Sequence, residues 1–278
     1  MDTGNRTAEL REIARRMRVE LLQMFSYGKA HHFGGSLSCI EIVAALYFYK
    51  MNFSASLVNN PERDRFIMSK GHSVPAQYVA LAMHGVFPME ELKTIKRLGA
   101  RLQGHPDMGK TPGIEAPTGS LGQGLSFANG LALGGRLDGL KYNLYIVLGD
   151  GELQEGQVWE AAMTTAHYKL GNVCAFIDRN RYQSQGAIDE MMGVEPVEER
   201  FRSFGWETVR IDGHNLDEIC AVLDRFDGKG GKPLAIVADT VKGKGIDFME
   251  NTYKYHNFAI TEEEYKKALQ KLQAELKQ

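Results

Sequence analysis

Short segments of only apolar residues at 144–148 (LYIVL), 173–177 (VCAFI) and 234–238 (LAIVA) have the length and composition of buried strands. A strand with apolar side chains on both faces has to be buried on both faces, as strands are in a parallel sheet covered by helices. Helix-like segments separate these runs, and such alternation is typical of an α/β fold. We therefore predict a doubly wound α/β domain with a mostly parallel sheet and helices on both faces.

The other segments are expected to surround this sheet. Ser38, followed three residues later by Glu41, has the pattern of a capping box, which predicts a helix from there to about residue 50. Glycine and proline in 99–119 indicate a long loop, and the small residues of 120–136 indicate a tightly packed helix. With no repeat or linker, residues 1–278 are expected to form one domain. Further strands are predicted at 65–68 and 206–211, and helices at 6–27, 74–84, 157–170, 216–226 and 262–276.

Composition excludes several classes of protein. The formal net charge is only -2, so no basic surplus points to a nucleic acid partner. No apolar run reaches the roughly 18 residues of a membrane-spanning helix, and the charged N-terminus does not resemble a signal peptide. The three cysteines form no CxxC pair and fit a reducing compartment. We therefore expect a cytoplasmic enzyme chain.

Two polar residues follow neighbouring buried strands. Asp150 lies directly after the run at 144–148, and Asn180 lies just past the run at 173–177. Ligands of open parallel sheets bind at the carboxyl ends of the strands, and Mg²⁺ prefers oxygen ligands. A bare GDG is more often a tight turn. The Asn 30 residues later, after one helix and one strand, favours a metal-bound diphosphate instead.

This combination resembles a known family. A GDG followed after about 30 residues by Asn is the thiamine diphosphate signature, and GDGELQEG with WEA resembles its transketolase version. Four further segments are similar to transketolase motifs, in the same order along nearly the whole chain. They are AHHFGGSLS at 30–38, SKGHSVPAQY at 69–78, LQGHPD with TPGIEAPTGSLGQGL within 102–125, and KGKGIDFMENTYKYHN at 242–257.

The resemblance implies roles for individual residues. Asp150 and Asn180 match the side-chain ligands of Mg²⁺, and Tyr182 matches the residue that supplies a backbone carbonyl ligand. His32 and His105 match the catalytic histidines that hold the donor sugar and transfer protons. The positions that match residues in contact with thiamine diphosphate are Lys70, His72, Gly119, Leu121, Gly151, Lys242 and His256.

Some residues keep an alternative interpretation. Glu155 and Glu160 match acids that link paired active sites across a dimer, but acids also favour the start of a helix. His31, in a glycine-rich loop, is expected to be simply exposed. Three further histidines lie outside the motifs, and we expect structural roles for them. Core or interface packing is expected for the pair Met191-Met192 and for the group of Phe201, Phe204 and Trp206. These histidines are His84, His167 and His214, the last before an expected Asn215 cap.

The resemblance also implies partners and substrates. It covers only the cofactor-diphosphate domain of a transketolase, so the chain is expected to be the N-terminal subunit of a split enzyme. The partner would be a C-terminal, pyrimidine-domain subunit, in an α2β2 complex acting on sugar phosphates. Pentose phosphates are the default substrates, although polar Ser184 and Gln185 leave room for a sugar such as apulose 4-phosphate. The alternatives are a 1-deoxyxylulose-5-phosphate synthase-like or keto-acid decarboxylating subunit, and a non-catalytic scaffold.

Overall fold

A single parallel sheet forms the centre of the protein. The computed structural model describes residues 3–25 and 28–276, and within them the strand order is β1-β2-β3-β5-β4, with every neighbouring pair parallel. This confirms the predicted α/β fold. The strands are β1 (Arg65–Met68), β2 (Leu144–Gly149), β3 (Val173–Arg179), β4 (Glu207–Asp212) and β5 (Leu234–Asp239).

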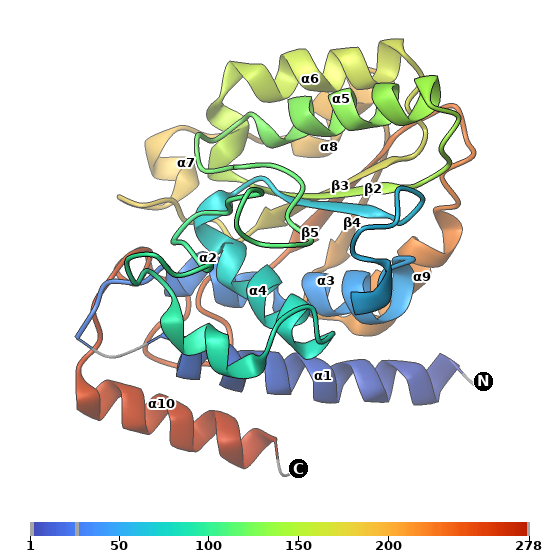
Figure 1. Cartoon of the computed structure of the whole chain (residues 1–278). Helices are drawn as coiled ribbons and strands as arrows, with labels where there is room; N and C mark the ends of the chain where they lie inside the picture. The colour runs from blue at the N-terminus through green and yellow to red at the C-terminus, as the bar shows by residue number, and fades with distance from the viewer. Residues whose placement is uncertain (1–2, 26–27, 277–278) are drawn as a thin grey trace.

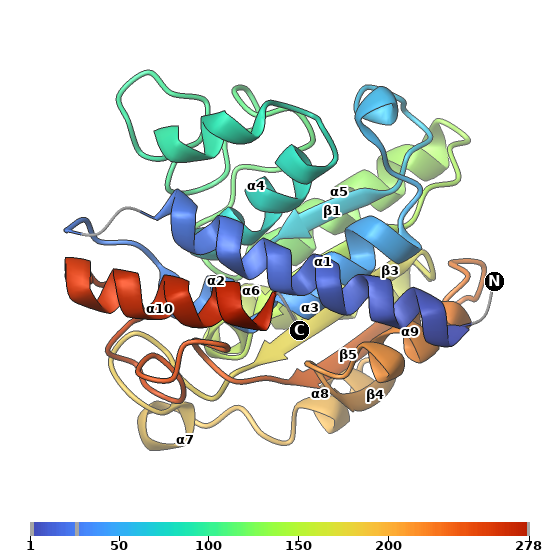
Figure 2. The same cartoon turned by 90° about the horizontal axis from the view of Figure 1, so that it is seen from below.

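Helices cover both faces of the sheet (Figures 1 and 2). One face carries α5 (Gly124–Leu137), α6 (Gly156–His167) and α8 (Val197–Ser203). The opposite face carries α1 (Thr3–Met24), α3 (Ile40–Ala45), α4 (Val74–Met83) and α9 (Leu216–Arg225), and α10 (Glu262–Glu275) packs outside α1. The shorter helical segments are α2 (Phe33–Ser38), η1 (Leu46–Lys50), η2 (Ala55–Leu57), η3 (Gly71–Ser73), η4 (Met89–Thr94), η5 (Gly151–Gln154) and α7 (Ile188–Met191).

The apolar strands divide their side chains between two cores. On β2, Tyr145 and Val147 belong to the core under α1, α3 and α4, whereas Leu144, Ile146 and Leu148 belong to the core under α5 and α6. All five are fully buried. Burying such a side chain stabilises the fold by about 1.5–3 kcal/mol, so a strand of this composition is stable only between two helical layers. No helix in the described part of the chain is both long and apolar enough to cross a membrane.

The structure corrects several predicted boundaries. Ser38 does not cap a helix: it ends α2, and its hydroxyl donates to Asp178 on β3 at 2.6 Å. The small-residue helix begins at Gly124 rather than at residue 120. The predicted first helix ends at Met24, and the last two residues assigned to it, 26–27, lie outside the described residues.

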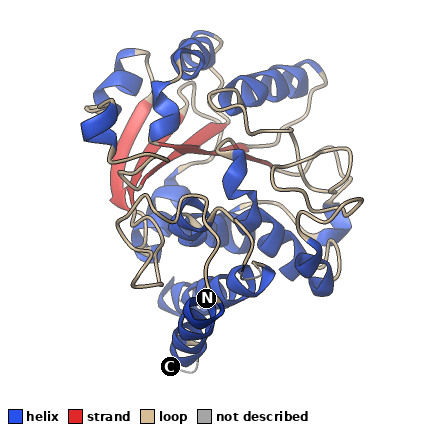
Figure 3. Cartoon of the chain, turned by 90° about the vertical axis from the view of Figure 1, so that its left-hand side faces the viewer, coloured by secondary structure: helices blue, strands red, loops and turns tan. Residues whose placement is uncertain are grey.

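Loops gather where the strands end, as Figure 3 shows on the side that faces the viewer. Residues 95–123 contain no strand or helix, which confirms the loop predicted over 99–119. This loop is attached to β1, because the Thr118 hydroxyl donates to the Met68 carbonyl at 2.6 Å. It also touches η3: a Cβ at Gly71 would lie 2.5 Å from the Thr118 carbonyl atoms. The attachment brings Gly119 and Leu121 to the edge of the sheet.

Candidate functional site

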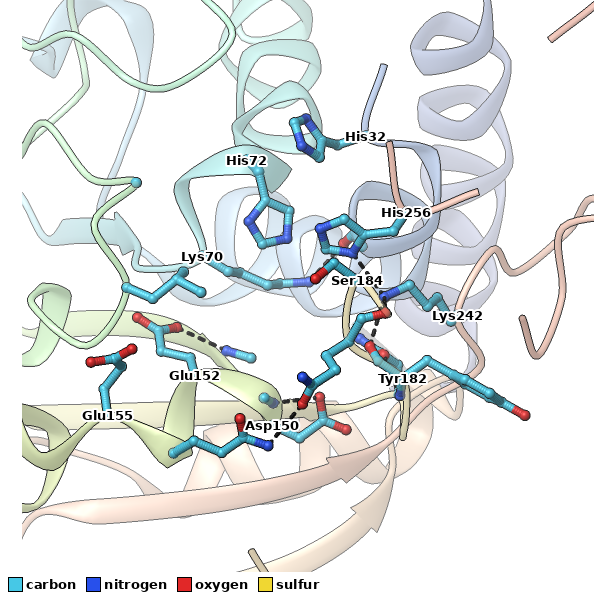
Figure 4. A pocket seen from close by; sticks show the side chains of 18 of the residues that line it. His32, Lys70, His72, Asp150, Glu152, Glu155, Tyr182, Ser184, Lys242 and His256 are labelled. Carbon is cyan, nitrogen blue, oxygen red and sulfur yellow. Dashed lines mark hydrogen bonds between the residues drawn. The ribbon is translucent and has the colours of Figure 1, made fainter. Parts of the chain in front are cut away.

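A cavity of about 270 Å³ opens at the carboxyl ends of the strands (Figure 4). Every residue that the sequence nominated for a site lines it, except Glu160. The nominated lining residues are His32, Lys70, His72, His105, Gly119, Leu121, Asp150, Gly151, Glu155, Asn180, Tyr182, Lys242 and His256. The chain therefore brings together segments that are up to 224 positions apart, from residue 32 to residue 256.

Asp150 is a buried carboxylate at the end of β2, with 3% of its surface exposed. One oxygen accepts from the backbone N–H of Gly151 at 2.9 Å and the other from that of Arg181 at 2.5 Å. Burial and the nearby charge of Asp178 raise the pKa of Asp150 to about 7. Because a buried negative charge beside another is costly, this position favours a cation.

Two further oxygens lie next to Asp150, on the segment that follows β3. The Asn180 amide donates to Asp178 at 3.0 Å, and its oxygen accepts from the Tyr182 N–H at 3.2 Å. The Tyr182 carbonyl accepts from the Lys242 ammonium at 2.6 Å. Carboxylate, amide and carbonyl oxygens are the donor set that Mg²⁺ prefers. No group of three or more His, Cys, Asp or Glu side chains among the described residues is arranged to hold a metal.

The two lysines of the cavity differ in how their charge is balanced. Lys70 is buried and donates to the Gly35 carbonyl at 2.6 Å and to Asp178 at 2.5 Å, so its charge is already paired. Lys242 donates to the Tyr182 carbonyl and to His256 at 3.1 Å, and burial lowers its pKa to about 8. The hydrogen-bond partners of Lys242 are therefore neutral, while the charges of Asp150 and Asp178 attract it without forming an ion pair, and an anionic group in the cavity would compensate its charge further.

Sequence reasoning missed two buried carboxylates beneath the site. Asp178 accepts from Lys70, Ser38, Asn180 and the Thr240 hydroxyl. These contacts keep its pKa below the ordinary value even though burial acts to raise it. The position of Asp178, at the end of the buried run at 173–177, was the only sequence signal.

Glu152 is the second missed carboxylate, and it ties a loop to the end of β2. It accepts from the Ser69 hydroxyl, the Gly122 N–H at 2.8 Å and the Gly149 N–H at 3.0 Å. Burial raises its pKa. It holds the loop that carries Gly119 and Leu121 against the strand, and so shapes one wall of the cavity.

Four histidines gather at the other side of the cavity. The ring centroid of His32 lies 5.1 Å from that of His72, 5.5 Å from that of His256 and 6.0 Å from that of His105. Burial lowers the pKa of each, to about 3 for His32 and about 4 for His256. All four are therefore neutral at pH 7, when each ring has one donor and one acceptor nitrogen.

The residues with alternative interpretations gave mixed outcomes. His31 is not exposed as predicted: 1% of its surface is accessible, and its ring stacks on Phe25 with centroids 4.5 Å apart. Glu155 lines the cavity and precedes the first residue of α6, whereas Glu160 is exposed on that helix. Met191 and Met192 are about half exposed or more, at 49% and 63%. Asn215 caps α9 as predicted, with its side-chain oxygen accepting two backbone N–H groups, and Phe201 and Trp206 are buried in the core.

Comparisons with known proteins agree with this geometry. A family model described as "Transketolase, thiamine diphosphate binding domain" matches residues 10–278. The chain is 44% identical over 263 residues to the 6-deoxy-6-sulfo-D-fructose transketolase subunit SqwG of Clostridium sp. (strain MSTE9), covering 95% of this chain and 94% of that protein. It is 39% identical over 255 residues to an apulose-4-phosphate transketolase subunit of Phocaeicola vulgatus, covering 92% and 90%.

A solved structure gives the same result in three dimensions. The transketolase of Campylobacter jejuni superposes with a TM-score of 0.88 at 30% identity, over 95% of this chain and 42% of that one. The chain thus spans less than half the length of that transketolase. The chain belongs to the transketolase family, matches its thiamine diphosphate binding domain, and is one part of a transketolase enzyme.

Proposed function

We propose that this chain forms the diphosphate-binding wall of an enzyme that moves a two-carbon ketol unit from a ketose to an aldose. The observation that carries the proposal is one cavity that combines a buried carboxylate, a lysine with neutral partners and four neutral histidines. Thiamine diphosphate supplies the capacity to stabilise a carbanion when it is bound. The residues of this chain bind and orient it, and move protons.

The proposed metal is Mg²⁺, held by the side chains of Asp150 and Asn180 and by the carbonyl of Tyr182. The Tyr182 carbonyl accepts from Lys242 in this structure, so we propose that the ammonium turns from the carbonyl to the diphosphate when the metal binds. The other proposed contacts to the cofactor are Lys70, His72, Gly119, Leu121, Gly151 and His256.

The histidines are proposed to divide into two groups. His256 hydrogen-bonds Lys242 and so lies on the diphosphate side. His105 lies in the loop at 99–119, where it contacts Gly119: a Cβ there would be 2.8 Å from the His105 ring. His105 and His32 are proposed to hold the donor hydroxyls and transfer protons, for which a neutral imidazole is suited.

The enzyme is proposed to require a pyrimidine-domain subunit in an α2β2 complex. Two relatives are named as transketolase subunits, and each matches this chain over at least 90% of its length. We propose Glu155 and Glu160, at the start of α6, as the acids that link paired sites. A cytoplasmic location is proposed because the three cysteines are free and buried.

The proposed donor is a ketose with an anionic group at its far end. The names of the two relatives indicate a sulfonated fructose and a phosphorylated apulose as their substrates, and the pentose phosphates are the third candidate. Gln154, Gln183 and Ser184 give the cavity a polar wall, and the Gln154 amide donates to the Gln183 side chain at 2.8 Å. We propose that this wall contributes to donor preference.

The test is reconstitution of the complex with its partner, followed by assays with thiamine diphosphate, Mg²⁺ and each of the three donors. Ketol transfer from at least one donor is expected, and its loss after chelation of Mg²⁺ would support the metal assignment. Release of CO2 from a keto acid would instead support a decarboxylating subunit. A complex that binds no thiamine diphosphate would leave only the scaffold.

The division of the histidines is tested by two substitutions in the same complex. His105→Ala should raise the KM for the donor and lower kcat about 10²-fold or more, because it removes a proton-transfer group, while cofactor affinity stays unchanged. His256→Ala should instead raise the thiamine diphosphate concentration needed for half-activity. Equal behaviour of the two variants would contradict the division.

A further inference from the structure

A closed chain of hydrogen bonds anchors the segment that carries Lys242. Arg18 on α1 donates to Glu41 at 2.5 Å and to the Lys244 carbonyl at 3.3 Å. The other oxygen of Glu41 lies 2.9 Å from Nδ1 of His214, whose Nε2 accepts from the Val241 N–H at 2.8 Å. Segment 241–244 is thus held at both ends, by His214 at its first residue and by Arg18 at its last.

The geometry fixes the tautomer of His214. A backbone N–H can only donate, so Nε2 of His214, which receives the Val241 N–H, carries no proton. Nδ1 therefore carries the proton and donates to Glu41. Glu41 is 7% exposed, and Arg18 together with His214 holds its pKa at about 2 although burial acts to raise it. The carboxylate is therefore ionised and keeps His214 oriented toward Val241.

The contacts of the Lys242 ammonium are all to uncharged groups, and between the two anchored ends the backbone is held by hydrogen bonds from Gly243 N–H to the Gly34 carbonyl at 3.1 Å and from Asn251 N–H to the Lys242 carbonyl at 3.0 Å. The side chain is 2% exposed and runs past Gly34, where a Cβ would lie 2.8 Å from its Cγ. Its Nζ contacts the carbonyls of Tyr182 and Gln183 and the His256 ring, none of which carries a negative charge. The position of the ammonium therefore depends on where the 241–244 backbone lies.

We propose that His214 and Glu41 are positioning residues that act through Lys242 on the affinity for the cofactor diphosphate. The inference rests on the proposed function, in which Lys242 binds that diphosphate. His214 lies between β4 and α9 and outside the residues that line the cavity, so its effect is indirect. The proposal thus gives a positioning role to His214, for which the sequence motifs indicated only a structural one.

Two substitutions distinguish the hydrogen bond made by Nε2 of His214 from the one made by its Nδ1. In His214→Gln the side-chain oxygen reaches about as far as Nε2 and can accept the Val241 N–H, whereas in His214→Asn the amide reaches only as far as Nδ1 and can donate only to Glu41. Calorimetric titration of thiamine diphosphate with Mg²⁺ into the reconstituted complex measures the effect. We expect His214→Asn to weaken binding about tenfold and His214→Gln by less than about threefold.

A double-mutant cycle shows whether the effect passes through Lys242. Adding His214→Asn to Lys242→Met should cause no further loss of affinity, because the ammonium that His214 positions is already absent. Additive losses would overturn the inference and leave the proposed function intact. A wild-type complex without thiamine diphosphate affinity would overturn both.

A second measurement needs neither cofactor nor partner. Hydrogen exchange of the Val241 amide in the isolated chain should accelerate in His214→Asn and stay slow in His214→Gln. His84→Asn is the matched control, because His84 also bonds a backbone group, the Tyr47 carbonyl at 3.0 Å, outside the cavity. It should change neither cofactor affinity nor Val241 exchange. Equal exchange in the two His214 variants would overturn the inference.

Discussion

At the residue scale, Asp150 joins the ends of two strands as well as facing the cavity. Replacing it by alanine removes the acceptor of the Gly151 and Arg181 N–H groups, each worth about 1 kcal/mol, but it also removes a buried charge beside Asp178. These changes oppose each other. The net change in the free energy of unfolding is therefore expected to be small.

We therefore predict that Asp150→Ala shifts the melting temperature of the cofactor-free chain by only a few degrees and abolishes the stabilisation by thiamine diphosphate with Mg²⁺ in the complex. Thermal melts of both states, with and without the two ligands, measure this. Asp189→Ala is the control, since Asp189 is an exposed acid outside the cavity. A variant stabilised as much as the wild type would exclude Asp150 as a metal ligand.

The site residues that the sequence predicted lie in local patterns, whereas the residues that it missed are defined by contacts between distant parts of the chain. Asp150 and Asn180 were predictable because strand ends and motif spacing are local patterns. Asp178 was not, since its partner Ser38 is 140 positions away and no pattern near either residue records the contact. His31 was wrongly expected to be exposed because its stacking on Phe25 depends on how the loop folds back over α1.

At the element scale, the strands were predicted to within about one residue at most ends, whereas the capping box at Ser38 was wrong. Both side chains that the capping box requires have stronger tertiary partners. Ser38 donates to Asp178, and Glu41 accepts from Arg18 and His214. A buried carboxylate with a charged partner outweighs a cap worth about 1 kcal/mol, so the helix starts elsewhere.

Two glycines with different surroundings, Gly130 in α5 and Gly71 in η3, allow a test of what a glycine contributes. A Cβ at Gly130 would meet no atom within 4 Å, whereas a Cβ at Gly71 would lie 2.5 Å from the Thr118 backbone. Gly130→Ala should therefore raise the stability of the isolated chain by about 0.5–1 kcal/mol, because alanine favours the helix. Gly71→Ala should lower it and displace the loop that carries Gly119. Urea unfolding of both variants measures this, and shifts of the same sign would contradict it.

At the scale of the whole molecule, the two helical layers differ in how well their outer surfaces are covered. One layer is covered by α10, which packs on α1. The other leaves apolar side chains of α5 and α6 accessible, with Phe127 39% and Met163 53% exposed. A shallow groove of about 390 Å³ on this face is lined by Gln123, Ser126, Phe127, Gly130, Leu131 and Gln157. A surface of this kind is suited to a contact between subunits.

The last prediction concerns assembly through this surface. The isolated chain should show no ketol transfer, and activity should appear on titration of the pyrimidine-domain subunit and saturate near one partner per chain.

Phe127→Glu should weaken assembly about 10- to 100-fold, because burial of one large apolar side chain contributes about 1.5–3 kcal/mol. Gln270→Glu adds the same charge on α10, on the opposite side of the molecule, and should leave assembly unchanged. Sedimentation velocity and the titration of activity measure both variants.

A cofactor held between two subunits loses one wall when the subunits separate. Phe127→Glu should therefore also raise the thiamine diphosphate concentration needed for activity when the protein is dilute, and this effect should disappear at high protein concentration. Turnover by the chain alone would contradict the split-enzyme interpretation, and equal assembly of the two variants would contradict this placement of the contact.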